Sequence, residues 1–536
     1  MKTSRLYLIL LSLLSLAFLN TAWVADDAFI TFRVIDNTLA GHGLVWNLGE
    51  RVQVYTHPLW FFLLLAGSAL YNDPYYVCLI VSALCLIATF WIALKTLHPC
   101  GALAFLILLS LFLSRAFVDY MTSGLENPLS YLLVALFLWV YFKRQAHRHY
   151  LFLLTLIAAA MYLNRPDAIV LIFPALLHAF LTDKKPWRAR TGVALAALSP
   201  VIAWTLFSLV YYGAPAPNTA LAKTATGIGA GKYCMQAFLY VVHSLKTDSL
   251  TIFLLAGGGI AGFTRSSRHW KALSSGILLW GVYLCVIGGD YMAGRFFSVP
   301  VLFAAIILAA ALRECLPKVQ YWCGTVAAAI LLVSLPQLSK TLFSPVSYDN
   351  KSFWYGIADE RGFYYAHLGL RPVLKNGGIQ HPWRVGGARL KNNDGNLYVG
   401  CVVGMAPYAG GPGLRWIDLL VLADAFRARL PAYSGSRVGH YSRAMPDGYL
   451  ESILTGQNKI TDPALAALYD DVLLATTGEL FRGERFMAIF RLNTGFHKNA
   501  AANFDREAAW PPGTSRDGCT WRIDGPEAFT RITEIQ

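Results

Sequence analysis

Two adjacent carboxylates, Asp26 and Asp27, stand directly after an apolar segment, Leu6–Val24, that is long enough to cross a bilayer. At a membrane exit, loss of solvation and mutual repulsion can raise the proton affinity of such a pair towards neutral pH, which suits a general base. A plainer interpretation stands beside this one: Asp26 caps a helix and Asp27 favours its positive end.

The residues after the pair predict a short amphipathic helix lying on the membrane. Apolar side chains recur at spacings of three and four along one face, at Phe29, Phe32, Ile35 and Leu39. Polar side chains occupy the other face, at Arg33, Asp36 and Asn37. Gly41 is expected to end this helix.

The composition describes a polytopic helical membrane protein. Of 536 residues, 56% are hydrophobic and only 14% are charged, and the mean hydropathy is +0.46. The formal charge of +14 does not indicate nucleic-acid binding, because the basic residues cluster in short loops between apolar runs, as cytoplasmic loops do.

The apolar runs predict about eleven membrane crossings of roughly 20 residues or fewer. The first, Leu6–Val24, is interpreted as an uncleaved signal anchor with its amino terminus inside. The others are Tyr75–Leu94, Gly101–Ser114, Pro128–Phe142, Tyr150–Leu163, Ala168–Leu181, Thr191–Tyr211, Ser249–Phe263, Leu273–Gly288, Val299–Leu312 and Tyr321–Leu338.

One further apolar run, Pro58–Leu70, is predicted not to cross. The basic loops 143–148, 184–188, 265–271 and 313–318 share the cytoplasmic side only if this run is interfacial or re-entrant. The opposite loops then carry unusual polar sets, at Asp26–Asp27, Asp119–Asn127, Asn164–Asp167, Tyr211–Lys246 and Gly289–Arg295. Ionisable residues crowded at one membrane face indicate a functional site.

We predict two parts: a membrane bundle, residues 1–338, with an external loop 25–74, and an extracytoplasmic mixed α/β domain, residues 339–536. In this tail, Leu414–Leu430 is expected to contain a helix, and Leu397–Val403 and Phe486–Leu492 are expected to be strands. If the tail is outside the cytoplasm, Cys401 and Cys519 can form a disulfide.

Arginines near lipid suit an amphiphilic phosphate, which makes Arg165 and Arg295 candidates for the phosphate of a donor, with Lys223 adding a point charge. Alternatives stand open for each neighbour. Asp167 can pair locally with Arg165, Asp290 with Arg295, Glu126 can simply begin a helix, and His57 can be a satisfied interface residue. A divalent cation bridging the acidic pair and a phosphate also fits the oxygen ligands.

The ordered motifs of this chain resemble terminal β-(1→2)-arabinofuranosyltransferases of the mycobacterial type. The resemblance spans nearly the whole chain, and His57 departs from it, since a small residue is expected there. It rests on Asp26–Arg33, Gly41–Asn47, Gly49–Val52, Tyr55–Trp60, Thr122–Pro128, Arg165–Asp167, Tyr212–Ala220, Gly288–Arg295, Trp416–Asp424 and Arg437–His440.

This resemblance implies the GT-C glycosyltransferase architecture and a polyprenyl-phosphate sugar donor. It implies Asp26 and Asp27 as the catalytic pair, and it suggests His440 and Asp418 for an acceptor site. The residues assigned to substrate binding are Arg165, Asp167, Asn218, Lys223, Asp290, Arg295, Glu126, His57 and His440.

The sequence thus predicts an integral membrane glycosyltransferase that moves a sugar, by default arabinofuranose, to an external glycan, lipid or protein acceptor. Its expected place is the cytoplasmic (inner) membrane, with the active site and the tail on the extracytoplasmic side. Two rivals are a transporter or flippase for the lipid-linked sugar and a non-enzymatic motility or envelope protein. Transporters often show related halves and charges near the bilayer midplane, and neither is seen here.

Overall fold

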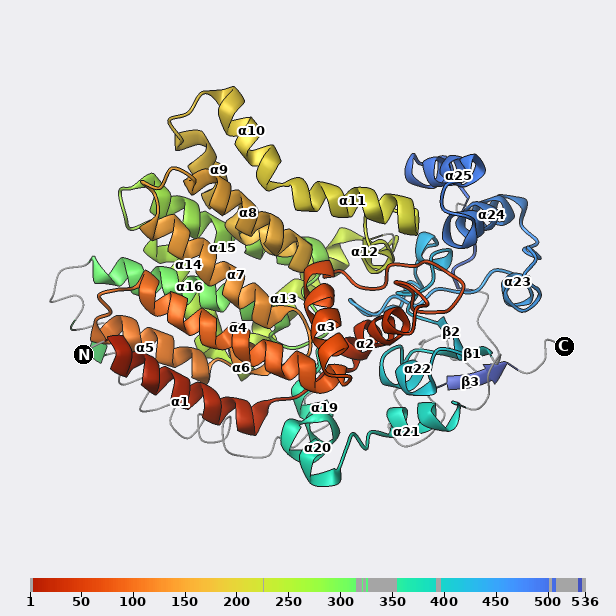
Figure 1. Cartoon of the computed structure of the whole chain (residues 1–536), viewed down its shortest axis with the longest axis horizontal. Coiled ribbons are helices and arrows are strands. Elements are labelled where there is room, and N and C mark those ends of the chain that lie inside the picture. Colours follow the sequence, from red (N-terminus) through yellow and green to blue (C-terminus); the bar gives the residue numbers. More distant parts are fainter. Residues whose placement is uncertain are drawn as a thin grey trace.

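The computed structural model describes residues 3–224, 226–314, 321, 324–325, 354–391, 397–500, 504–507 and 529–532. A bundle of helices occupies one end of the molecule and the tail the other, with α2 (Asp26–Leu39) between them (Figure 1). The predicted last span, Tyr321–Leu338, lies outside the described residues except for positions 321, 324 and 325.

The predicted apolar runs that lie within the described residues form helices within a few residues of their expected ends. α4 begins at Pro74, because proline is tolerated in the first turn of a helix. The helices Trp187–Ala197 and Ser199–Tyr212 meet at a bend of 53°. The bundle contains α1 (Thr3–Thr21), α4 (Pro74–Thr96), α5 (Ala102–Ser110), η1 (Leu111–Leu113), α6 (Arg115–Tyr120), α7 (Asn127–Lys143), α8 (Tyr150–Asn164), η2 (Pro166–Ala168), α9 (Ile169–Thr182), α10 (Trp187–Ala197), α11 (Ser199–Tyr212), α14 (Ser249–Ala261), α15 (Arg268–Ile287) and α16 (Arg295–Arg313).

The helices show a multi-pass membrane protein. Four described helices are long and apolar enough to cross a bilayer, or six if each bent pair is one span, and shorter apolar helices accompany them. The number of about eleven crossings stays a prediction.

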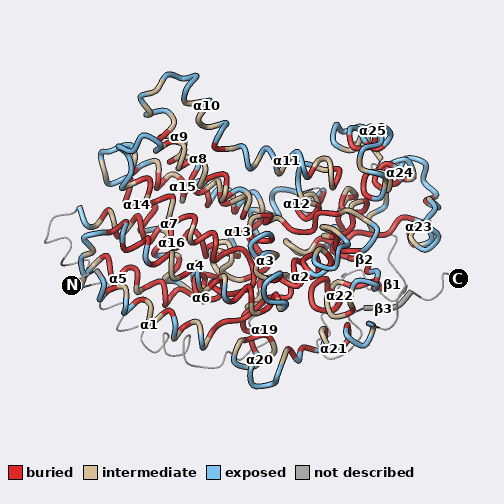
Figure 2. Tube along the Cα trace, viewed as in Figure 1, coloured by how far each residue is buried: buried red, intermediate tan, exposed pale blue. Residues whose placement is uncertain are grey.

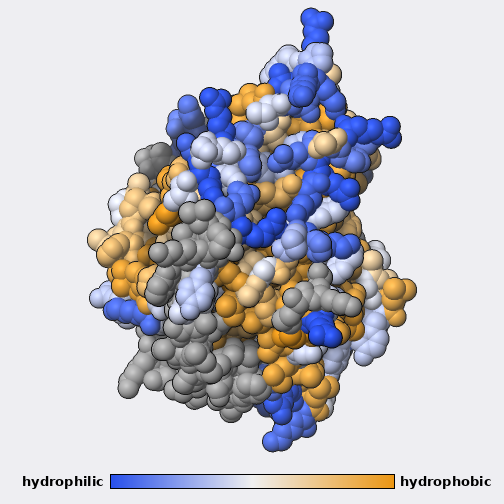
Figure 3. Space-filling model, turned by 90° about the vertical axis from the view of Figure 1, so that its left-hand side faces the viewer, coloured by the Kyte–Doolittle hydropathy of each residue, from blue (hydrophilic) through white to orange (hydrophobic). Residues whose placement is uncertain are grey.

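The basic loops gather at one end of the bundle, as their charges predict. Lys143 Nζ donates to the carbonyl of His98 over 3.1 Å, and Arg313 donates to the same carbonyl over 3.1 Å. Lys185 Nζ donates to the carbonyl of Arg148 over 3.3 Å. Figure 3 looks onto the end of the bundle opposite the tail, where hydrophilic side chains gather between hydrophobic flanks.

α3 (Pro58–Leu70) has the predicted ends and lies at a steep angle to the bundle helices in Figure 1. α2 also forms as predicted, and its expected position on the membrane surface stays a prediction. It packs against both α3 and α22 (Met405–Gly410), and Figure 2 shows it buried along most of its length.

Of the three residues on the predicted polar face of α2, Arg33 and Asn37 are buried because they bind main-chain carbonyls of the external loop and the tail, whereas Asp36 is exposed. Arg33, 2% exposed, donates to the carbonyls of Trp46 over 2.7 Å and Leu414 over 2.7 Å, and also to that of Pro407. Asn37 donates to the carbonyl of Val45 over 2.9 Å. Such main-chain acceptors satisfy a charge that sequence periodicity assigns to the surface.

The segment Tyr211–Lys246, expected as a loop, contains α12 (Asn218–Thr224) and α13 (Ala230–Thr247). The bend between α13 and α14 is 113°. The residues of α13 that are buried recur at helical spacing, at Ala237, Tyr240 and Ser244. Polar residues such as Lys232, Gln236 and Lys246 interrupt its apolar residues, so this helix contains no long continuous apolar run.

The described part of the tail combines helices with a small sheet. β1 (Leu397–Gly400) pairs parallel with β2 (Arg415–Asp418) and antiparallel with β3 (Phe529–Ile532), in the order β2-β1-β3. The tail helices are α19 (Glu360–Leu368), α20 (Leu370–Asn376), α21 (Pro382–Arg389), α22, η4 (Arg427–Arg429), α23 (Tyr449–Thr455), α24 (Pro463–Thr477) and α25 (Gly483–Asn493).

Two tail predictions are wrong and one is confirmed. The strand in Leu397–Val403 is confirmed by β1, but Leu414–Leu430 forms β2 and η4, and Phe486–Leu492 lies within α25. Cys401 is disulfide-bonded, and its predicted partner Cys519 lies outside the described residues.

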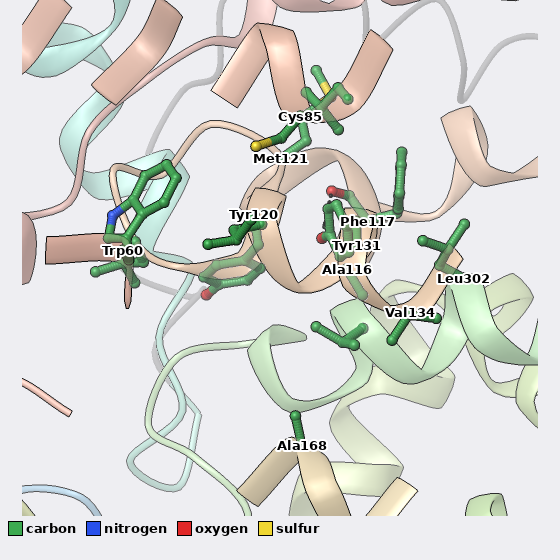
Figure 4. Close-up of a cluster of buried hydrophobic side chains, with 14 of the residues drawn as sticks. Trp60, Cys85, Ala116, Phe117, Tyr120, Met121, Tyr131, Val134, Ala168 and Leu302 are labelled. Atoms are coloured by element: carbon green, nitrogen blue, oxygen red, sulfur yellow. Dashed lines mark hydrogen bonds between the residues drawn. The ribbon is translucent and has the colours of Figure 1, made fainter. Parts of the chain in front are cut away.

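The core runs continuously from the bundle into the tail. One cluster of buried side chains includes Phe117 and Tyr131 of the bundle as well as Tyr364 and Met405 of the tail. Figure 4 shows its centre around α6, where the rings of Phe117 and Tyr131 stack with centroids 4.8 Å apart. This packing fixes the loop that follows α6 and carries Glu126. The boundary at residue 338 stays a prediction.

Candidate active site

Asp26 and Asp27 begin α2, and the tail covers Asp26. The amide of Met405 donates to Asp26 Oδ1 over 2.7 Å. A Cβ added to Gly404 would lie 2.6 Å from Asp26 Cγ, so only glycine permits this approach. Burial raises the pKa of Asp26 to about 7; the Met405 amide opposes this rise and the charge of Asp27 adds to it.

Asp27 is held from a different side. Tyr291, in the loop between α15 and α16, donates its hydroxyl hydrogen bond to Asp27 Oδ2 over 2.8 Å. Asp27 is only half-buried, whereas Asp26 is 7% exposed. The two neighbouring carboxylates therefore differ in environment, which allows them different roles.

Glu126 joins both predicted phosphate-binding arginines. Its carboxylate lies 3.0 Å from Arg165 Nη1, 3.5 Å from Arg295 Nη2 and 3.4 Å from His57 Nδ1. Burial opposes ionisation, but the charges of Arg295 and Arg165 prevail and lower the pKa of Glu126 to about 2. Glu126 is the N-cap residue of α7, but its side chain makes no capping hydrogen bond. Its carboxylate forms ion pairs with the two arginines instead.

The two arginines differ in how far they are satisfied. Arg165 donates through Nε and Nη2 to Asp167, over 2.8 and 3.2 Å, and through Nη1 to Glu126. Arg295 makes longer contacts, including 3.6 Å from Nη1 to Asp290 Oδ2. Its buried Nε has no hydrogen-bond partner among the described residues. Arg295 can therefore receive an anion, whereas Arg165 mainly holds Glu126.

Lys223 and His57 complete the bundle's contribution. Lys223 is exposed and interacts electrostatically with Asp290, Arg295 and Asp27. The ring of His57 lies between Glu126 and Thr31, with 3.0 Å between Nε2 and the Thr31 hydroxyl oxygen. His57, just before α3, is thus buried and supports the site, whereas Lys223 is the cation of the site that is exposed to solvent.

The loop that carries Glu126 is fitted closely to α2. Ala25 N–H donates to the carbonyl of Ser123 over 2.8 Å. Gly124 has a φ of +78°, and an added Cβ would lie 2.8 Å from both Ala28 Cβ and Val24 Cγ1. The conformation and the contact both require glycine here.

Two predicted residues have mainly structural contacts. Asn218 donates to the carbonyls of Val421 and Leu422, each over 2.9 Å, and so ties α12 to the tail. Asp418 accepts from the amides of Leu420 and Ala423 at the end of β2. His440, by contrast, lies at the site, because its ring contacts that of Tyr291.

Three functional candidates were missed by sequence reasoning. Tyr291 lies in the motif Gly288–Arg295, which assigns it no role. The available signal was a hydroxyl-bearing side chain between two charged residues of the sequence, Asp290 and Arg295. Glu360 of α19 and Arg437 come from the tail. The interaction of Glu360 with Asp27 and with Arg437 depends on long-range packing. Burial, reinforced by the charge of Asp27, raises the pKa of Glu360 well above its usual value.

Among the residues that the structure describes, no three His, Cys, Asp or Glu side chains gather as a metal-binding group. A divalent cation between the acidic pair and a phosphate stays a prediction.

The fold and this cluster define a multi-pass helical membrane protein with a charged site where the bundle meets its tail. No protein-family model matches the chain. It is similar to the terminal β-(1→2)-arabinofuranosyltransferase of Mycobacterium tuberculosis, with 26% identity over 328 residues, covering 52% of this chain and 51% of that protein. The enzyme of the same name from Corynebacterium glutamicum is 27% identical over 333 residues, covering 53% and 47%.

The resemblance to these transferases is thereby confirmed, and the chain spans about half the length of each relative. Among solved structures, ArnT from Cupriavidus metallidurans bound to undecaprenyl phosphate has a TM-score of 0.46 at 14% identity, covering 76% of this chain and 74% of that one. Arabinofuranosyltransferase AftD from Mycobacteria, as a mutant, has a TM-score of 0.41 at 16% identity, covering 80% and 35%.

Proposed function

We propose that this protein is a membrane glycosyltransferase that moves a sugar, by default arabinofuranose, from a polyprenyl-phosphate donor to an external glycan, lipid or protein acceptor. The observation that supports this proposal most is an acidic pair, Asp26 and Asp27, close to an arginine whose N–H groups are not all hydrogen-bonded within the described part of the chain. Arg295 interacts with Asp27 and Asp290 as well as Glu126, while its Nε lacks a partner among the described residues. The similarity to arabinofuranosyltransferases supports the choice of sugar.

In this reaction the acceptor hydroxyl attacks the anomeric carbon of the donor. The proton of the hydroxyl passes to Asp27, the bond from the anomeric carbon to the phosphate oxygen breaks, and the polyprenyl phosphate leaves. Arg295 and Lys223 bind the phosphate and stabilise its growing charge, and Arg165 fixes Glu126 behind Arg295. Asp26, the first residue of α2, is held by the tail and so fixes the position of Asp27 next to it.

The charge pattern supports the proposed location. Because the basic loops occupy the opposite end of the bundle, the positive-inside rule supports an extracytoplasmic position of the carboxylates and the tail, which we propose for the inner membrane. A lipid carrier would enter from the bilayer beside the bundle, and the acceptor would come from the envelope side.

Transfer from radiolabelled polyprenyl-phosphate sugars tests this proposal. Purified protein is given arabinofuranosyl, then mannosyl and glucosyl donors, beside its Asp26→Asn and Asp27→Asn variants. We expect transfer by the parent protein and a loss of at least about 100-fold in Asp27→Asn, the scale of a general base. Full activity of a folded Asp27→Asn protein would refute the mechanism. Tight donor binding without transfer of any sugar would favour a lipid-linked sugar carrier.

A further inference from the structure

Tyr291 links the carboxylate pair to the tail. Its hydroxyl donates to Asp27 Oδ2 over 2.8 Å. Tyr291 is 6% exposed, and its ring meets the ring of His440 edge to face, with centroids 4.0 Å apart. The guanidinium carbon of Arg437 lies 5.5 Å from the centroid of the Tyr291 ring. One side chain is thus in contact with the proposed base and with two tail residues.

The main chain on both sides of this ring is also bound by the tail. The Ala358 amide donates to the carbonyl of Tyr291 over 2.7 Å, and the Ala293 amide donates to the carbonyl of Ala358 over 2.9 Å. Tyr291 N–H donates to the carboxylate of Asp290 over 2.8 Å. Tyr291 therefore has one orientation while the tail is docked.

A tight turn of the tail, residues 437–440, forms the other wall for the ring. His440 N–H donates to the carbonyl of Arg437 over 3.1 Å, and the side chains of these two residues are also 3.1 Å apart, from Nη2 to Nε2. Gly439 has a φ of +88°, and an added Cβ would lie 2.6 Å from Tyr291 Cδ1. The absence of a side chain at Gly439 lets the turn approach the ring.

We propose that Tyr291 is a positioning residue for the base. By occupying Oδ2 of Asp27 it leaves Oδ1, which accepts no hydrogen bond from a described residue, to take the proton of the acceptor hydroxyl. As that proton moves to Oδ1, the new bond forms between the acceptor oxygen and the anomeric carbon, and the bond to the phosphate oxygen breaks. The 437–440 turn holds the ring, so docking of the tail sets the orientation of the base. This role rests on the proposed transferase function.

Tyr291→Phe tests the role because it removes the hydroxyl and keeps the ring. We expect kcat to fall about tenfold with the KM of the donor within about twofold, since donor contacts are unchanged while base orientation is lost. The acidic limb of the pH profile of kcat should move to higher pH, because the ionised carboxylate loses a hydrogen bond. The other charged groups facing Tyr291, namely Glu360, Asp290, Arg295 and Arg437, remain in both proteins.

Tyr449→Phe is the matched control, because the Tyr449 hydroxyl also donates to a buried carboxylate, Asp424 Oδ2, over 2.6 Å. It should leave kcat and the pH profile unchanged. Gly439→Ala should reproduce the loss in kcat by displacing the ring. Gly456→Ala is its control, since Gly456 has a similar φ of +70° and nothing within 4 Å of an added Cβ.

The outcomes separate the two proposals. A parent protein that transfers no sugar refutes the transferase function and this role with it. An active parent with unchanged kcat and pH profile in Tyr291→Phe overturns only the positioning role. If Gly439→Ala does not fold, Tyr291→Phe still decides, because phenylalanine preserves the packing of the ring.

Discussion

Replacing Glu126 with glutamine should destabilise the protein by about 3 kcal/mol. Glu126 is 2% exposed, and although burial opposes it, the charges of Arg295 and Arg165 lower its pKa from 4.5 to about 2. Since a tenfold change in proton affinity corresponds to about 1.4 kcal/mol, the ionised form is favoured by about 3 kcal/mol in the folded state. Breaking a buried ion pair by removing one partner costs about 3–5 kcal/mol, in agreement.

The assay is thermal unfolding in detergent at pH 7, with Glu479→Gln as the control. Glu479 also pairs with an arginine, Arg482, over 2.8 Å, but both side chains are more than 60% exposed, at 73% and 63%. Exposed pairs contribute about 0–1 kcal/mol, so Glu479→Gln should melt like the parent while Glu126→Gln melts several degrees lower. Because the folded pKa is the lower one, the advantage of the parent is full above about pH 4.5 and falls towards pH 2. Equal melting temperatures for the two variants would refute the reasoning.

Further predictions concern α2 and the tail residues 404–414 that pack on it. Burial raises the pKa of Asp26 from 3.8 to about 7, so this group's contribution to stability is full below about pH 4 and is lost as the pH rises to 7; Asp26→Asn should therefore raise the melting temperature at pH 8 more than at pH 4. Gly404→Ala would bring a Cβ within 2.0 Å of the Asp26 carbonyl oxygen and should cost about 1–3 kcal/mol, measured by thermal unfolding, whereas Gly483→Ala, with nothing within 4 Å, should be neutral. Arg33→Lys loses the fork that binds the carbonyls of Trp46 and Leu414, so hydrogen exchange should accelerate at residues 405–414, and unchanged exchange would contradict this.

Local sequence signals located the helices well and the contacts between distant segments poorly. The ends of α3 follow from Pro58 and the apolar run after it, because proline favours the first turn of a helix. The burial of Arg33 could not be predicted, because the carbonyls that it binds belong to Trp46 and Leu414, and Leu414 is distant in the sequence. β2 was missed because its pairing partner, β1, determines it more than its own composition does.

The candidate site shows the same division. The motifs brought Asp26, Asp27, Glu126, Arg165 and Arg295 into one hypothesis, and the structure gathers them. The unequal engagement of Arg165 and Arg295 follows from Asp167, which lies two residues from Arg165 and satisfies it locally. Asn218 was assigned to substrate because a motif contains it, yet its amide binds carbonyls of the tail.

The most direct test separates donor binding from transfer. Affinity for a polyprenyl phosphate and the rate of transfer are measured for the parent, Asp27→Asn and Arg295→Gln, with each variant first shown to be folded. The account predicts that Asp27→Asn binds the lipid phosphate like the parent but transfers sugar at least about 100-fold more slowly. Arg295→Gln should bind the lipid phosphate at least about tenfold more weakly. Undiminished binding by Arg295→Gln, or undiminished transfer by Asp27→Asn, would contradict the division of roles between the cations and the carboxylates.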